Sequence, residues 1–230
     1  MRREEFFIKI SHLNIRSLKN KVQEVKQITA TVKPHLFGLS ECELKNNTET
    51  FDINKLKVPG YKLELPKSWE AHGYARVVVY VKNGLIYERV HELEDDHVQS
   101  IWIKTGFKNT KPFYVANIYR EHSSELGNSV AAQHQKLQLL INQFEAAIEH
   151  QISSDQNEIH ILGDINLDSL KWHLDDYNLK PLARMIINFC NVKFIRLIRT
   201  IHNSIINKLL NWIIFLTFII SRIDNCFRFF

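Results

Sequence analysis

Residues 158–172 read EIHILGDINLDSLKW, an apolar run that ends in the tetrapeptide GDIN at residues 163–166. The short run before the tetrapeptide is rich in isoleucine, which is typical of a buried β-strand. Gly163 allows the backbone to turn sharply where the run stops. We therefore expect Asp164 and Asn166 at the loop edge of a sheet, where ligand sites tend to form, rather than in its packed interior.

Six other segments share this strand character, because they are short, rich in Val, Ile, Phe or Tyr, and in several cases alternate in polarity. Besides the strand at residues 159–163, the sequence predicts strands at residues 6–13, 36–40, 76–81, 98–104, 113–119 and 192–198. The protein is therefore predicted to be rich in β-sheet.

Apolar residues at helical spacing lie between some of these strands. One stripe runs through residues 18–32 after Ser17, a good N-cap residue, and a second runs through residues 137–148 after Ser129. A third and weaker stripe covers residues 179–190. Strands thus occur both singly between helices and as a meander. This mixture predicts an α/β (α+β) fold, a four-layer sandwich of two packed mixed β-sheets flanked by helices.

The composition fits one globular domain. The 230-residue chain is 45% hydrophobic and 24% charged, which argues against disorder and against a fibrous repeat. A formal net charge of +5 suits a polyanionic partner such as nucleic acid.

The cysteines and the two ends of the chain bear on its location. The three cysteines are widely spaced and outside any C-x-x-C pattern, which argues against a disulfide framework and against a zinc site. The N-terminus MRREEFFIKI has no apolar run of signal-peptide length, so an intracellular location, nuclear or cytoplasmic, is expected. Residues 209–220 are strongly apolar but fall short of the roughly 20 residues that span a bilayer. We expect them to be buried and expect no membrane partner.

Polar residues at three predicted strand ends indicate the chemistry. Asn14 follows IKISHL, Glu41 follows LFGLS, and Asp164 and Asn166 follow EIHILG. Carboxylates supply the oxygen ligands that Mg²⁺ prefers, and neutral amides donate to phosphate oxygens without adding repulsive charge. Taken one at a time, these residues also suit turns, because Asp and Asn bond to their own backbone there.

Five segments occur in an order and spacing that is more specific than any one of them: HLNIRSLKNK (residues 12–21), PHLFGLSECEL (34–44), HGYARVVVYVKNGL (72–85), FYVANIYR (113–120) and EIHILGDINLDSLKW (158–172). This set resembles the endonuclease/exonuclease/phosphatase superfamily, and within it the apurinic-type endonuclease domains of non-long-terminal-repeat retrotransposons. The resemblance implies such a domain at residues 1–200. Residues 201–230 would be a degenerate or truncated C-terminal end of the same domain.

The resemblance also implies a metal site and a set of reacting groups. Asn14 matches the asparagine that supports the metal, and Glu41 matches the principal metal-binding carboxylate. The implied cofactor is Mg²⁺, with Mn²⁺ as the alternative.

Four further residues receive roles at the phosphate from the resemblance. Tyr119 matches the tyrosine that contacts the scissile phosphate, and the neighbouring Arg120 is predicted to bind substrate. Asp164 matches the aspartate that positions or deprotonates the attacking water, and Asn166 would stabilise the transition state. Without the other motifs, a core aromatic at a strand end would be the favoured interpretation of Tyr119.

The C-terminal part departs from the family's pattern. Family members close the site with an aspartate in a late strand and a Ser-Asp-His segment, and this sequence contains no Ser-Asp-His. Asn211 occupies the place of the late aspartate in one register and Asp224 in another, and His202 is the nearest histidine by order. A truncated or frameshifted retroelement copy would account for both departures.

The resemblance implies phosphodiester hydrolysis, as a Mg²⁺-dependent endonuclease domain that nicks DNA. In an intact element its partner would be a reverse transcriptase domain that extends the new 3′ end. Two alternatives stay open. One is a catalytically impaired remnant that binds nucleic acid or a protein, and the other is a phosphatase of the same superfamily, because a fold does not fix its substrate.

Overall fold

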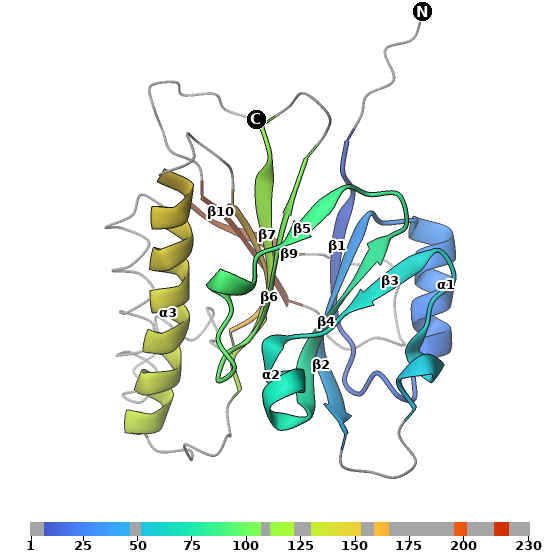
Figure 1. Ribbon diagram of the computed structural model, residues 1–230, viewed down its shortest axis with the longest axis horizontal. Coiled ribbons are helices and arrows are strands. Elements are labelled where there is room, and N and C mark those ends of the chain that lie inside the picture. The colour runs from blue at the N-terminus through green and yellow to red at the C-terminus, as the bar shows by residue number, and fades with distance from the viewer. Residues whose placement is uncertain are drawn as a thin grey trace, which may run out of the picture.

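The computed structural model describes residues 7–46, 52–106, 111–121, 130–152, 159–165, 196–201 and 214–220. Two β-sheets face each other, and a helix covers the outer face of each sheet, α1 on one side and α3 on the other (Figure 1). Both sheets contain parallel and antiparallel neighbours. The predicted sandwich of two mixed sheets flanked by helices is confirmed.

The smaller sheet has the strand order β1-β2-β4-β3. Its strands are β1 (Ile10–Asn14), β2 (Leu36–Lys45), β3 (Tyr61–Glu64) and β4 (Tyr74–Lys82). β1 and β2 run parallel, and the other pairs are antiparallel.

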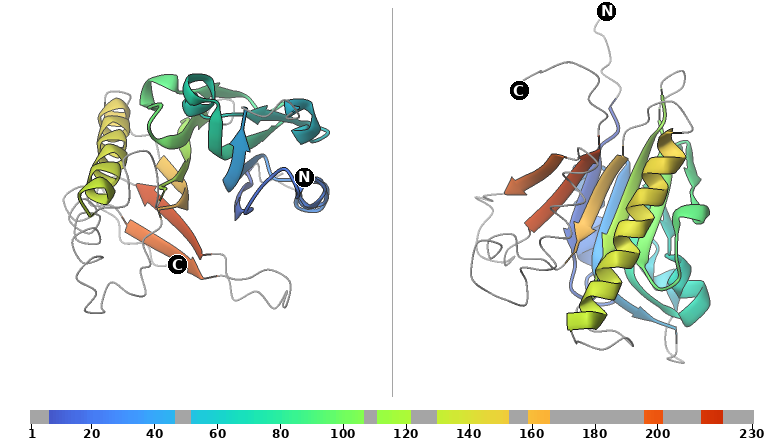
Figure 2. Two further views of the ribbon diagram at one scale, coloured as in Figure 1. Left: turned by 90° about the horizontal axis from the view of Figure 1, so that it is seen from below. Right: turned by 90° about the vertical axis from the view of Figure 1, so that its left-hand side faces the viewer.

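The larger sheet has the strand order β5-β6-β7-β8-β10-β9. Its strands are β5 (Tyr87–Arg89), β6 (Gln99–Thr105), β7 (Phe113–Tyr119), β8 (Ile159–Asp164), β9 (Arg196–Ile201) and β10 (Ile214–Ile220). Only β7 and β8 are parallel neighbours, and the chain passes between them through a helix, as parallel strands require. β10 and β9 continue the sheet beyond β8 (Figure 2).

Three α-helices and two 3-10 turns complete the described residues. They are α1 (Val22–Val32), α2 (Lys67–His72), α3 (Val130–Ile152), η1 (Ile53–Leu56) and η2 (His91–Leu93). Among the described residues, no helix is both long enough and apolar enough to cross a membrane.

The buried apolar side chains form three clusters, one for each interface between layers. The first joins α1 to the smaller sheet, and the third joins α3 to the larger sheet. The middle cluster lies between the sheets and consists of Leu36, Val77, Val79, Val81, Ile101, Ile103, Val115 and Leu162. Alternate residues of β4 face opposite sides, so Val78 and Tyr80 point to the α1 side while Val77 and Val79 point to the other sheet.

A buried amide crosses the apolar space between the sheets. Asn117 of β7 is 1% exposed, and its Nδ2 donates to the carbonyls of Leu39 in β2 and Val78 in β4, each at 3.0 Å. Gly38 leaves room for it, because a Cβ atom there would lie 2.8 Å from Asn117 Oδ1. The two sheets are therefore joined by directional bonds as well as by apolar contact.

A buried ion-pair cluster joins the sheets a second time. Arg89 of β5 pairs with Glu64 of β3 at 3.1 Å and also pairs with the fully buried carboxylate of Glu94. The Glu94 carboxylate in turn accepts a hydrogen bond from the backbone N–H of Trp102, at 2.9 Å. Glu64 also pairs with Lys62, at 2.8 Å, so each of the three buried or half-buried charges has an oppositely charged partner, which a buried ion requires.

The described strands and helices agree with most of the predicted ones. The strand predicted at residues 113–119 coincides with β7, and those at 36–40, 76–81, 98–104 and 159–163 fall within or overlap β2, β4, β6 and β8. The short strands β3 and β5 were not predicted, and neither was β10, whose segment was expected only to be buried. The third predicted helix, at residues 179–190, and Ser129 lie outside the described residues, and so does the first part of the strand predicted at 192–198.

The predicted N-cap at Ser17 is wrong. α1 begins at Val22, with Lys21 as its N-cap. Ser17 has a left-handed backbone (φ 74°), and its N–H donates to the carbonyl of Glu41 at 2.8 Å. The segment after β1 therefore continues to bond to β2 before the helix starts, and this long-range bonding overrides the local cap preference.

We expect Asn117→Leu to lower the free energy of unfolding by about 2–4 kcal/mol, because two buried carbonyls lose a donor. Urea denaturation followed by circular dichroism measures this. Asn142→Leu is the matched control, because Asn142 is exposed on α3, and it should change stability by less than about 0.5 kcal/mol. Equal effects of the two substitutions would contradict a structural role for the Asn117 amide.

The burial of His12 makes the stability of the protein depend on pH. Its side chain is buried in β1, and desolvation lowers its pKa to about 3. In the unfolded chain a histidine titrates near pH 6.5, so the unfolded state binds the extra proton between about pH 6.5 and pH 3. The contribution of neutral His12 to the free energy of unfolding is therefore complete above about pH 6.5 and decreases as the pH falls from 6.5 toward 3.

We therefore expect acidification from pH 7 to pH 5 to destabilise the wild type by about 2 kcal/mol more than His12→Leu. The measurement is the free energy of unfolding at several pH values. His91→Leu is the control, since it removes a histidine that is exposed on η2 and not buried in a sheet. If the free energy of unfolding depends on pH in the same way in the wild type and in His12→Leu, the low pKa of buried His12 is contradicted.

Candidate active site

The candidate site lies where parallel strands of both sheets end. Asn14 is the last residue of β1 and pairs with Ser40 of β2, directly before Glu41. In the other sheet Tyr119 is the last residue of β7 and pairs with Asp164, the last residue of β8. Each sheet thus brings two of the predicted residues to the same edge.

The side chain of Asn14 connects these two pairs. Its Nδ2 donates to Glu41 Oε1 at 2.7 Å and lies 3.5 Å from Asp164 Oδ2, the outer limit of a hydrogen bond. Two carboxylates from different sheets therefore converge on one amide group. The structure places Asn14, Glu41 and Asp164 together, as their positions at strand ends led us to expect.

Glu41 lies at an irregularity in β2. The register between β2 and β4 shifts between Ser40 and Leu44, and Glu41 adopts a left-handed backbone with φ 54°. Such a conformation of a non-glycine residue is strained by about 1–3 kcal/mol and persists where surrounding bonds enforce it. The carbonyls of Ser40 and Glu41 accept backbone hydrogen bonds from the segment after β1, at 2.9 and 2.8 Å, and these bonds fix the bulge.

Gly163 determines how closely β8 approaches β7 before Asp164. It has φ 133°, and a Cβ atom there would lie 1.9 Å from the carbonyl oxygen of Ile118. No other residue fits without separating the strands. The glycine that the sequence assigned to a sharp turn is therefore also required for a close backbone contact.

Arg120 holds the turn that follows Asp164. Its side chain is 4% exposed, its backbone N–H donates to the Asp164 carbonyl at 2.9 Å, and its Nε donates to the Ile165 carbonyl at 2.6 Å. Its guanidinium also bonds to Gln133 of α3. Burial lowers the pKa of Arg120, against the opposing effect of the Asp164 carboxylate. These contacts position Asp164, and the predicted substrate contact of Arg120 stays a prediction.

Arg76 belongs to the site although the sequence reasoning did not identify it. Its guanidinium lies over the Tyr119 ring, 5.9 Å from the centroid, and its Nε bonds to Glu121 Oε1 at 3.0 Å. It also reaches Glu43 Oε1 at 3.4 Å. A signal was present in the sequence, because Arg76 is the only charge in the apolar run ARVVVYV.

The donor set suits a hard divalent cation. Glu41 and Asp164 provide carboxylate oxygens, and Asn14 Oδ1 is buried with no hydrogen-bond donor reaching it among the described residues. Carboxylate and amide oxygens are the ligands that Mg²⁺ takes. A cation there would also offset the repulsion between two carboxylates that share one amide.

Four residues singled out in the sequence cannot be compared with this geometry. Asn166, Asn211, His202 and Asp224 lie outside the described residues. Their suggested roles stay predictions.

Solved structures identify the fold. The endonuclease domain of TRAS1, a telomere-specific non-LTR retrotransposon, superposes with a TM-score of 0.56 at 14% identity, covering 92% of this chain and 84% of that chain. A mannosyl-6-phosphatase from Bacteroides thetaiotaomicron gives 0.56 at 14%, covering 93% and 85%. An endonuclease/exonuclease/phosphatase family protein from the same bacterium gives 0.55 at 14%, covering 92% and 80%.

The chain therefore has the fold of the endonuclease/exonuclease/phosphatase superfamily, as the sequence resemblance predicted. This is a hydrolase-type fold that nucleases and phosphatases share. No protein-family model and no curated protein matches the sequence.

Gly163→Ala tests the close approach of β7 and β8. We expect it to prevent cooperative folding or to lower the free energy of unfolding by more than about 3 kcal/mol, because strain and a backbone clash add. Gly84→Ala is a matched control, since Gly84 also has a positive φ (87°) but nothing within 4 Å of an added Cβ. It should lose only about 1 kcal/mol. If thermal and urea denaturation show similar losses of stability for Gly163→Ala and Gly84→Ala, the backbone clash at Gly163 is refuted.

Proposed function

We propose that the protein is a Mg²⁺-dependent phosphodiesterase that nicks DNA, as the endonuclease domain of a retrotransposon-derived protein. The observation that supports it most is the Asn14 side chain, which brings the Glu41 and Asp164 carboxylates together across two sheets. An oxygen-rich site of this kind at the carboxyl ends of parallel strands suits cation-assisted phosphate chemistry.

Glu41 and the Oδ1 atom of Asn14 would hold the cation. When bound, Mg²⁺ supplies positive charge that stabilises the developing charge on the phosphate oxygens. Asn14 fixes the orientation of Glu41 through the 2.7 Å bond from its Nδ2, so the carboxylate is already in place before a cation binds. This preorganisation reduces the reorganisation needed at the moment of reaction.

Asp164 would take the proton of the attacking water. Its backbone is held by the N–H of Arg120 and by its pairing with Tyr119 in the parallel ladder of β7 and β8, so its carboxylate starts from a fixed position at the strand end. A general base must lie within hydrogen-bond reach of the proton that it removes, and a fixed strand end meets that requirement better than a loop.

Tyr119 and Arg76 would contact the phosphate from the other side of the site. Tyr119 is paired with Asp164 across the β7–β8 ladder, and its hydroxyl is able to donate to a phosphate oxygen. Arg76 keeps a positive charge against the Tyr119 ring, where it would favour a polyanion. The net charge of +5 favours the same class of substrate.

DNA is proposed as the substrate because the TRAS1 domain, which shares the fold, is an endonuclease. The missing Ser-Asp-His segment favours a second candidate, a domain of this fold that binds nucleic acid without cleaving it. The phosphatase neighbour keeps phosphate monoesters as a third class of ligand.

A plasmid-nicking assay with Mg²⁺ tests the proposal. We expect Glu41→Gln and Asp164→Asn each to slow nicking at least about 100-fold, because each removes a charge that the transition state needs. Glu24→Gln is the control, since Glu24 is an exposed carboxylate in the first turn of α1 and its replacement should leave nicking within about threefold of wild type.

Equal activity in the wild type and both site variants would reject the proposed site. If the wild type does not nick, salt-dependent DNA binding that persists without turnover identifies the non-catalytic domain. Hydrolysis of p-nitrophenyl phosphate without nicking identifies a phosphatase.

A further inference from the structure

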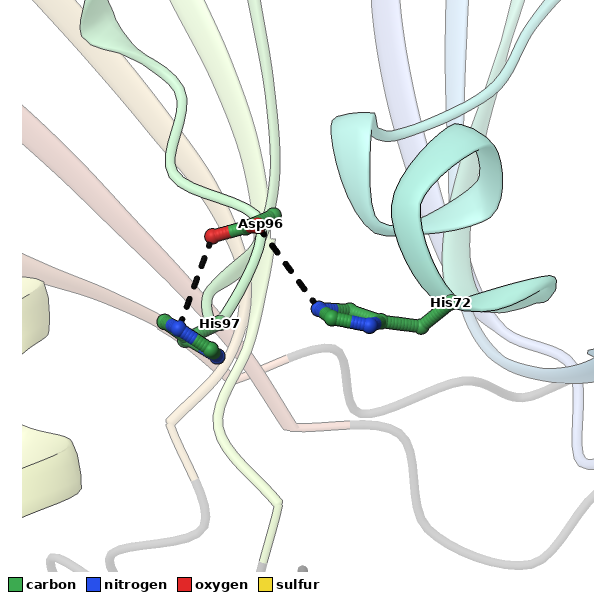
Figure 3. A group of neighbouring side chains, drawn as sticks. All are labelled: His72, Asp96 and His97. Atoms are coloured by element: carbon green, nitrogen blue, oxygen red, sulfur yellow. Dashed lines mark ion pairs between the residues drawn. The ribbon is translucent and has the colours of Figure 1, made fainter.

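A group of two histidines and one aspartate, side chains of the types that ligate metals, lies at the junction of the two sheets, outside the donor set of the candidate active site. It consists of His72, Asp96 and His97, whose ligand atoms all lie within 4.8 Å of one another. The Asp96 carboxylate lies between the two imidazoles (Figure 3). One of its oxygens is 3.7 Å from His72 Nε2, and the other is 3.7 Å from His97 Nε2.

The two imidazoles come from different elements but face each other. Their ring centroids are 5.6 Å apart, with an interplanar angle of 25°. His72 is the last residue of α2, on the side of the smaller sheet, whereas His97 lies between η2 and β6, on the side of the larger sheet. The group therefore bridges the two halves of the fold.

Neighbouring bonds fix the positions of both backbone segments. Gly73 ends α2 in a left-handed conformation, with its N–H bonded to the Trp69 carbonyl. On the other side, the N–H of His97 donates to Asp95 Oδ1 at 2.7 Å. The histidines are thus presented from two defined turns and not from freely variable loops.

Gln99 ties these two turns to each other. Its Nε2 donates to Ser68 Oγ of α2 at 2.8 Å, and its Oε1 accepts from the backbone N–H of Arg76 in β4 at 2.7 Å. Both Gln99 and Ser68 are buried. The separation between the His72 turn and the His97 turn is therefore set by buried hydrogen bonds, and only the exposed side chains need to rotate to close on an ion.

We propose that His72, Asp96 and His97 form a binding site for a borderline divalent transition metal of the Zn²⁺ class. Two imidazole nitrogens and one carboxylate oxygen suit such a metal and do not suit Mg²⁺, which takes oxygen ligands. Zn²⁺ binds these atoms at about 2.0–2.2 Å, so small rotations of the three side chains bring them into range. The fourth position stays open to water or to a ligand.

The cysteine spacing that argued against a zinc site does not bear on this one, because its ligands are histidine and aspartate. The metal would join α2 to the segment before β6 and so hold the two sheets together at one edge. His97 also lines a small pocket with Tyr119 and Lys136.

Zn²⁺ titration by isothermal calorimetry tests the site, with ZnCl₂ alone as the probe. The starting chain carries Glu41→Gln and Asp164→Asn, which removes the carboxylates of the candidate active site from the measurement. We expect one Zn²⁺ per chain. His72→Ala and His97→Ala should each weaken the affinity at least about 10-fold, and the combination His72→Ala, Asp96→Asn, His97→Ala should abolish binding. Mg²⁺ should not compete.

A matched histidine and two further measurements make the test specific. His91→Ala, which removes an exposed histidine on η2, should bind Zn²⁺ as the starting chain does. Zn²⁺ should raise the thermal midpoint of the starting chain and not that of the triple variant, and Co²⁺ should give a visible absorption band that the triple variant lacks. Circular dichroism without metal verifies that each variant is folded.

Absence of saturable Zn²⁺ binding in the starting chain would overturn the proposal. Unchanged binding in the folded triple variant would do the same, because the metal would then bind elsewhere. Neither result depends on nicking activity, so this test and the test of the proposed function fail separately.

Discussion

The Asn117 side chain donates two hydrogen bonds across an otherwise apolar interface, and the relative placement of the two sheets follows from them. Apolar contacts such as Val77 against Val115 hold the sheets together but are not directional. An amide that donates to two specified carbonyls permits one alignment, because a shift of either sheet would leave buried polar groups without partners. Gly38 completes this constraint by leaving space for the amide.

The active-site geometry depends on this alignment. Asn14 and Glu41 belong to one sheet and Asp164 belongs to the other, so the contact of Asn14 with both carboxylates exists only when the sheets are in register. Local strain contributes as well, since Glu41 leaves the regular path of β2 to point its carboxylate at Asn14. In the larger sheet, Arg120, which follows β7, and Gly163 of β8 fix the backbone of Asp164.

Sequence patterns predicted the parts of this structure that depend on local periodicity. The strand at Phe113–Tyr119 was placed at its exact bounds because a short apolar run has few other ways to be buried. Ser17 was misassigned as a helix cap because its backbone bonds to β2, a partner that a local pattern does not reveal. β3 and β5 were missed because strands of four and three residues carry almost no periodic signal.

The residues of the candidate site also divide into those that local sequence indicates and those that only contacts in the folded protein reveal. Asn14, Tyr119 and Asp164 are the last residues of their strands, a position that the local sequence indicates. Glu41 was expected at a strand end but lies at a bulge within β2, which continues to Lys45. The roles of Arg76 and Asn117, and the grouping of His72 with Asp96 and His97, arise from contacts between segments far apart in the chain. Spacing along the sequence carries no record of such contacts, and only the folded arrangement of the two sheets reveals them.

The division of the chain between the sheets also sets the order in which the site is assembled. Every strand of the smaller sheet lies within residues 10–82, and every strand of the larger sheet comes after it. During synthesis Asn14 and Glu41 emerge first, while Asp164 emerges 150 residues after Asn14. Contacts of such long sequence separation form late, since a large loop must close before they contribute. A chain interrupted before β8 would therefore carry a complete first sheet and half of the candidate site.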